Sequence, residues 1–111
     1  MRYMLLIGAD DTAGPEARAR LEAMDGCGGW SQEMTERGVL VGGGALRPET
    51  ATVRVREGEV LVSDGPFAET KDLVGGFSMI ECATMEEAVR IAARHPVAAV
   101  GKIEIRPVLE P

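Results

Sequence analysis

The stretch from Thr52 to Lys71, TVRVREGEVLVSDGPFAETK, determines how the rest of this chain must be arranged. Apolar residues lie on both sides of Glu57-Gly58, a pattern typical of two antiparallel strands joined by a tight turn. Gly65-Pro66 then bends the chain, because the proline ring fixes its own φ and keeps the preceding residue out of the helical region. Asp64 can bond backbone amides two residues further on. We therefore expect a β-hairpin that ends in a structured turn.

The segment before this hairpin predicts a strand, a helix and a second strand. Residues 3–7, YMLLI, indicate a buried strand, and Pro15 suits the first turn of a helix. A kink or break is expected where glycines interrupt this helix, and Gly38 should end it. A strand follows at 39–41. The apolar face of this helix consists of Leu21, Met24, Cys27 and Met34. The interrupting glycines are Gly26, Gly28 and Gly29.

The segment after the hairpin repeats this order. Residues 77–80, FSMI, predict a strand, and Thr84 followed by Glu87 is a capping box that begins a helix. His95-Pro96 should close that helix. In the last strand, 102–106, the two isoleucines should point inward and the charged residues outward.

The order β-α-β, hairpin, β-α-β predicts an α+β sandwich of the ferredoxin-like type, with an antiparallel sheet and helices on one face. Neighbouring strand residues such as Leu5 and Leu6, or Met79 and Ile80, are both apolar. One layer of helices cannot cover both faces of such a sheet. We therefore expect a homodimer that packs sheet face on sheet face.

Composition describes one domain over residues 1–111, with 45% hydrophobic and 27% charged residues. The formal net charge of −6 and the few aromatic residues argue against a nucleic-acid surface. The apolar run at 3–7 is too short for a signal peptide or a membrane span, so we expect a cytoplasmic protein with no membrane partner. Cys27 and Cys82 lack metal-ligand spacing and are expected to be small buried residues.

Several ordered blocks resemble the YCII-related proteins, in particular their DGPF branch. The block 62–71, VSDGPFAETK, is similar to the signature of that branch, whose chemistry is mostly unassigned. The resemblance extends over most of the chain and implies the dimeric α/β-barrel type of ferredoxin-like fold. The other blocks are 2–7, 38–43, 46–48, 52–55, 75–77, 86–88, 95–96 and 103–108.

His95 is the only histidine, so any imidazole chemistry must use it. It lies at the predicted end of a helix, where the negative end of the dipole favours the protonated ring. Some YCII-related proteins are similar to lyases or isomerases with a His/Asp pair, the histidine on the first helix and the acid before a proline. This chain has no histidine in its first helix, and His95 stands before Pro96. We therefore hypothesise a swapped catalytic pair, His95 with Asp64. Alternatively, His95 caps the last carbonyls of its helix and Asp64 only holds the turn.

Four further residues are candidates for substrate binding. Lys71 could bind an anionic group or a carbonyl oxygen, with Glu69 beside it, and Arg47 could bind a carboxylate. Trp30 could line a pocket or instead lie in the core or a dimer contact. The run Gly42-Gly43-Gly44 lacks the residues of a phosphate loop and is interpreted as a flexible strand exit.

Three functions fit these features. The first is a small lyase or isomerase, without cofactor or metal, in which His95 moves a proton beside a carbonyl or a halide-bearing carbon. The second is a homodimer that binds a small metabolite without turnover. The third is an interaction or regulatory protein, because the resemblance implies an association with an alternative sigma factor. Nothing in the residues names a substrate.

Overall fold

The computed structural model describes residues 1–8, 28–47, 49–64 and 74–109. The predicted first half of the long helix, with Leu21, Met24, Cys27 and Gly26, lies outside these residues, as do Glu69 and Lys71. The described elements, in chain order, are β1 (Arg2–Gly8), α2 (Gly28–Glu36), β2 (Leu40–Ala45), β3 (Ala51–Arg56), β4 (Glu59–Asp64), β5 (Val74–Glu81), α3 (Met85–Ala93), α4 (Val97–Val100) and β6 (Lys102–Pro107).

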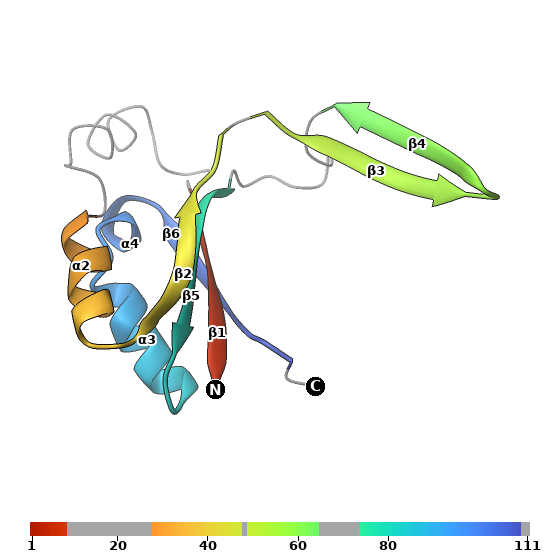
Figure 1. Cartoon of the computed structure of the whole chain (residues 1–111). Helices are drawn as coiled ribbons and strands as arrows, with labels where there is room; N and C mark the ends of the chain where they lie inside the picture. Colours follow the sequence, from red (N-terminus) through yellow and green to blue (C-terminus); the bar gives the residue numbers. More distant parts are fainter. Residues whose placement is uncertain (9–27, 48, 65–73, 110–111) are drawn as a thin grey trace.

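Four strands form an antiparallel sheet in the order β2-β5-β1-β6, and β3 and β4 form a separate two-stranded sheet. Helices α2, α3 and α4 all lie on one face of the four-stranded sheet (Figure 1). This is the ferredoxin-like α+β arrangement predicted from the element order, with the hairpin inserted between β2 and β5. The prediction of the fold is confirmed.

The two faces of β1 have different surroundings. Tyr3, Leu5 and Ile7 are buried beneath the helices, whereas Met4 and Leu6 point to the other face and are only partly buried. Leu5 pairs with Ser78 of β5 and Ile105 of β6. The remaining buried apolar residues come from the helices and from β5, and they are Trp30, Met34, Ile80, Ala88, Ile91, Ala92 and Val97.

The predicted end of the first helix and the predicted start of the later helix are both confirmed. Helix α2 ends where Gly38 adopts a φ of 71°, and the Val39 amide donates to the Met34 carbonyl while the Gly38 amide donates to Thr35. These two bonds are those of a Schellman motif, which favours glycine at the left-handed position. Helix α3 begins after Thr84, whose hydroxyl oxygen accepts from the Glu87 amide at 3.2 Å.

The three consecutive glycines of β2 are a correction to the sequence prediction. Gly42, Gly43 and Gly44 are not a flexible exit but strand residues paired with β5. Gly43 has a φ of 153°, and a Cβ there would collide with the carbonyl of Phe77. Glycine is therefore required for β2 to approach β5 this closely, beside a register shift between Leu40 and Gly42.

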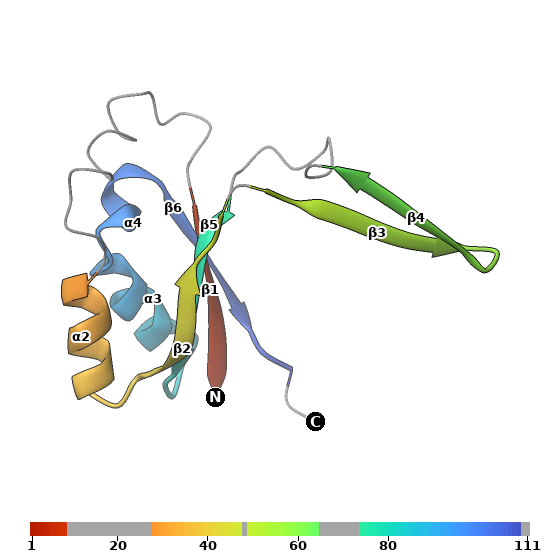
Figure 2. The ribbon, with the colours of Figure 1, turned by 45° about the horizontal axis from the view of Figure 1, so that its top comes forward.

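The hairpin of β3 and β4 matches its prediction. Val53 pairs with Val62 and Val55 with Val60, and the turn residues Glu57 and Gly58 both have positive φ, 51° and 78°. Two positive φ values in a two-residue loop define a type I′ turn. Figures 1 and 2 show the hairpin projecting away from the four-stranded sheet, on the side opposite to the helices.

Candidate functional site

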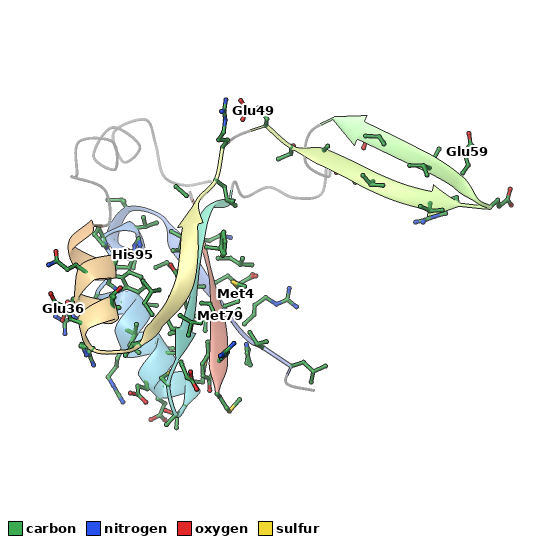
Figure 3. All side chains as sticks on the ribbon, viewed as in Figure 1. Met4, Glu36, Glu49, Glu59, Met79 and His95 are labelled. Carbon is green, nitrogen blue, oxygen red and sulfur yellow. The ribbon has the colours of Figure 1, made fainter. Side chains whose placement is uncertain are left out.

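The imidazole of His95 lies inside the helical layer, where the chain passes from α3 to α4. Its side chain is 3% exposed, although histidine is a polar residue. Figure 3 shows it on the helix side of the sheet, with Met4 and Met79 on the other side. The indole ring of Trp30, from α2, meets the imidazole edge-on with 4.8 Å between the ring centroids. Three helices therefore hold this ring in one orientation.

One ring nitrogen of His95 accepts a hydrogen bond from the backbone. The Val97 amide donates to Nδ1 at 3.1 Å. Because Nδ1 accepts a hydrogen bond, the neutral ring carries its proton on Nε2. His95 thereby satisfies the first amide of α4, a four-residue helix whose N-cap, Pro96, makes no side-chain cap bond. The bond from Val97 thus leaves Nδ1 unprotonated and assigns the ring proton to Nε2.

Burial lowers the pKa of His95 below its ordinary value. The sequence had predicted the opposite direction, because a histidine at a helix C-terminus is stabilised in its charged form. That expectation is wrong: the loss of water around the ring outweighs the helix dipole. His95 is therefore a neutral side chain at neutral pH, able to donate a hydrogen bond from Nε2.

Trp30 joins α2 to α3. It is 4% exposed, and its Nε1 donates to the carbonyl of Ile91 at 3.0 Å. Of the alternatives open for this residue, the placement in the core is the one observed. The bond fixes the indole ring, which packs edge-on against His95. Direct contact of Trp30 with a substrate stays a prediction.

Asp64 is the last residue of β4, and its side chain lies outside the described part of the structure. The pairing of His95 with Asp64 is therefore still a prediction. The bond from Val97 to Nδ1 limits how this pair could form, because the Asp64 carboxylate could then bond only to Nε2. In that geometry both ring nitrogens would be occupied, and the carboxylate rather than the imidazole would be the group that accepts a proton from a substrate.

Arg47 lies two residues beyond the end of β2 and already has a carboxylate partner. Its Nε and a terminal nitrogen donate to the two carboxylate oxygens of Glu49 at 3.1 and 3.0 Å. This contact holds the pKa of Glu49 below its usual range. Both side chains are exposed, so a substrate carboxylate would have to displace Glu49. Among the described residues, no contact joins Arg47 to His95.

Cys82 is less buried than the sequence analysis predicted. Its side chain is partly buried against the core, and burial raises the pKa of the thiol. A raised pKa reduces the fraction of reactive thiolate at neutral pH.

The sequence did not reveal Val97 or helix α4. The run Val97-Ala98-Ala99-Val100 is too short to show a helical period. The signal that could have indicated it is the proline before the run, since proline is favoured at the start of a helix. In the described ranges, no group of three or more His, Cys, Asp or Glu could hold a metal ion. No helix among these residues is long and apolar enough to cross a membrane.

Comparison with known proteins assigns this ferredoxin-like chain to a family. The YCII-related domain matches residues 1–111, and the chain belongs to the YCII-related family. An uncharacterised protein of Rhizobium meliloti (strain 1021), R00369, is 41% identical over 80 residues, which are 68% of this chain and 64% of that protein. The chain thus spans less than two thirds of the length of this relative.

A solved structure shares the fold. It is 5-chloro-2-hydroxyhydroquinone dehydrochlorinase (TftG) from Burkholderia phenoliruptrix AC1100, in complex with 2,5-dihydroxybenzoquinone. The similarity covers 100% of this chain and 96% of the other, with a TM-score of 0.56 and 12% sequence identity. At this identity the likeness supports the fold.

Proposed function

We propose that this protein processes a small organic molecule, as a lyase or isomerase that needs no cofactor. The observation that carries the proposal is the fixed, neutral imidazole of His95, whose Nδ1 accepts from the Val97 amide and whose proton is therefore on Nε2. Family membership and the fold shared with a dehydrochlorinase support it. A preorganised donor in a buried environment stabilises an oxyanion without reorganising during the reaction.

The roles that we propose differ from the first hypothesis. A carboxylate, Asp64 in our proposal, takes the proton from a carbon next to a carbonyl or a halide-bearing carbon, although β4 of the same chain lies on the side of the sheet away from the helices that hold His95 (Figure 1). The electron pair of that C–H bond forms a C=C bond and the halide leaves, or it moves onto the carbonyl oxygen as an enolate. Nε2–H of His95 donates to the oxygen that becomes negative. Lys71 and Glu69 remain the proposed substrate-binding neighbours of Asp64 in the sequence.

The second candidate function is a dimer that binds a small metabolite without turnover. The burial of His95 favours this candidate, because a 3% exposed ring that caps α4 has a sufficient structural role. Under both candidates we propose a homodimer through the open sheet face. Its support is the apolar character of Met4, Leu6, Phe77 and Met79, which point away from the helices. An association with a sigma factor stays a prediction from the resemblance.

Two substitutions separate the roles of the two ring nitrogens. The amide oxygen of His95→Asn can occupy the place of Nδ1 and keep the bond from Val97, but this variant has nothing at Nε2. His95→Gln places its amide group near Nε2 and loses the cap. Release of chloride from 5-chloro-2-hydroxyhydroquinone and calorimetric binding of 2,5-dihydroxybenzoquinone are measured for wild type, both variants and Asp64→Asn.

If the enzyme proposal holds, His95→Asn folds and binds the quinone but loses at least ~100-fold in chloride release, the usual effect of removing one oxyanion donor. Asp64→Asn should lose activity to a similar degree. Binding by the wild type without chloride release, unchanged in His95→Asn, would support the binding-protein candidate. A wild type that neither binds the quinone nor releases chloride removes this substrate class from the proposal.

A further inference from the structure

One face of the β3–β4 hairpin consists of four valines. Val53 lies directly opposite Val62, and Val55 directly opposite Val60, so the four side chains share one face. Their exposed fractions are 61%, 63%, 56% and 63%. The other face carries the pairs Thr52–Ser63, Arg54–Leu61 and Arg56–Glu59, which are mostly polar. This hairpin has the alternation of a strand that covers a core, but within its own chain the valine face remains exposed.

An isolated hairpin of this kind is not expected to be stable in water. Two strands without a packed face are only marginally stable, and a contiguous apolar surface of β-branched residues usually marks a contact site. The type I′ turn at Glu57-Gly58 fixes the register locally but buries none of the valines. The valine face therefore requires a covering surface from outside the described part of this chain.

The position of the hairpin indicates what that surface is. Helices, four-stranded sheet and hairpin follow one another in this order in both Figure 1 and Figure 2. The hairpin thus extends on the same side as the open face of the sheet, where Met4 and Met79 point (Figure 3). Any molecule seated on the open face lies beside the hairpin.

The apolar surfaces on this side of the molecule favour a second copy of the chain as the covering molecule. The open face presents Met4, Leu6, Phe77 and Met79, which are partly buried. The valine face adds a second apolar surface beside it. A stable dimer buries about 800 Å² on each partner, so contact over both surfaces favours a stable dimer more than contact over the open face alone.

We propose that the β3–β4 hairpin is an exchanged arm whose valine face packs on a second copy of this chain. The proposal rests on the homodimer through the open sheet face and adds to it a distinct contact. In a twofold dimer each copy contributes one arm and receives one, so both valine faces are covered at once. The arm also ends at Asp64, the carboxylate of the proposed function.

Two adjacent residues of β4 give a matched test. Val62→Glu places an acid in the valine face, whereas Leu61→Glu places the same acid on the opposite face, across from Arg54. Both side chains are exposed in one copy, at 63% and 44%. Sedimentation velocity over a range of concentrations gives the dimer dissociation constant. We expect Val62→Glu to raise it at least ~10-fold, because an unpaired carboxylate would be buried, and Leu61→Glu to leave it within ~3-fold.

The fluorescence of Trp30 verifies that each variant keeps its helical layer, because this tryptophan is buried in α2, which lies away from the hairpin (Figure 1). A wild-type dimer that Val62→Glu does not weaken overturns the arm but leaves the sheet-face dimer standing. A wild type that is monomeric at every concentration overturns both. Neither result affects the assay of chloride release by the wild type, so failure of the arm and failure of the proposed chemistry are distinguishable.

A photo-crosslink distinguishes exchange from folding back on the same chain. p-Benzoylphenylalanine replaces Val60 in one variant and Leu61 in another. Irradiation of the variant at Val60 should give a product of twice the chain mass on a denaturing gel, and the variant at Leu61 should give little of it. Crosslinking confined to a single chain mass at Val60, in a sample that sediments as a dimer, would overturn the exchange.

Discussion

The four-stranded sheet and the β3–β4 hairpin use the same kinds of strand-forming residues, yet they bury them to very different extents. Leu5 and Ile80, in the sheet, are fully buried beneath the helices. Val53 and Val62, in the hairpin, are more than half exposed. In the sheet, burial alternates along β1, and in the hairpin apolar and mostly polar residues alternate along both strands. The alternation therefore predicts a strand and its two faces, while the covering layer is set by other parts of the chain or by another molecule.

The two regions also differ in how their glycines act. In β2, Gly43 allows two backbones to approach, because a Cβ would collide with Phe77. In the hairpin, Gly58 serves only its own turn, and no atom outside that turn comes within 4 Å of the position of its Cβ. The sheet is thus stabilised by contacts between distant segments, and the hairpin by local geometry.

The largest expected difference comes from the same substitution made in both regions. Leu5→Ala removes a fully buried side chain from the middle of the sheet and should reduce the free energy of unfolding by about 2–5 kcal/mol. Leu61→Ala, at a position 44% exposed on the polar face of the hairpin, should cost less than about 1 kcal/mol. Urea unfolding followed by Trp30 fluorescence measures both. Equal losses would show that the hairpin is an integral part of the core.

A smaller effect is expected from pH, and it concerns the helical layer alone. The pKa of His95 is lowered in the folded protein, so the unfolded chain, with a value of about 6.5, binds the proton more readily. The contribution of neutral His95 to stability is therefore complete above that pH and is lost as the pH falls through the folded-state value.

This linkage is measured as a difference between two proteins. The stability of the wild type should fall more steeply than that of His95→Asn between neutral and mildly acidic pH, because the asparagine keeps the Val97 bond and does not titrate there. Urea unfolding at a series of pH values gives both curves, and the carboxylates, common to both proteins, cancel in the difference. Parallel curves would mean that the His95 ring ionises equally in the folded and unfolded chain.

Local patterns predicted most of the fold. Period-two alternation indicated the hairpin and β6, and the capping residues Thr84 and Gly38 marked helix ends that the structure confirms. Two features escaped because they are not local. The role of Gly43 depends on the backbone of β5, and α4 is a single turn whose first amide is satisfied by His95.

The candidate site was less predictable than the fold. The sequence singled out His95, but it could not show that Trp30, on another helix, would cover the ring. That contact and the burial it brings reverse the expected direction of the pKa. The position in a helix end is a local signal, and desolvation is the sum of contacts from three helices. The second group of the proposed pair, Asp64, lies at the end of the hairpin, where local pattern indicates a turn but not its neighbours.

The smallest expected effect tests whether the hairpin is stabilised independently of the sheet. Glu57 has a φ of 51°, a left-handed conformation that asparagine adopts at lower cost than glutamate. Glu57→Asn should therefore stabilise the hairpin by about 0.5–1 kcal/mol, and Gly58→Ala, at a φ of 78°, should weaken it. Amide hydrogen exchange in β3 and β4 should slow in the first variant and accelerate in the second.

Urea unfolding reported by Trp30 should be the same in both, since the turn has no contact with the helical layer. A shift of the Trp30 transition in parallel with the hairpin amides would mean that the hairpin and the sheet unfold as one cooperative unit, within one chain or across the proposed dimer.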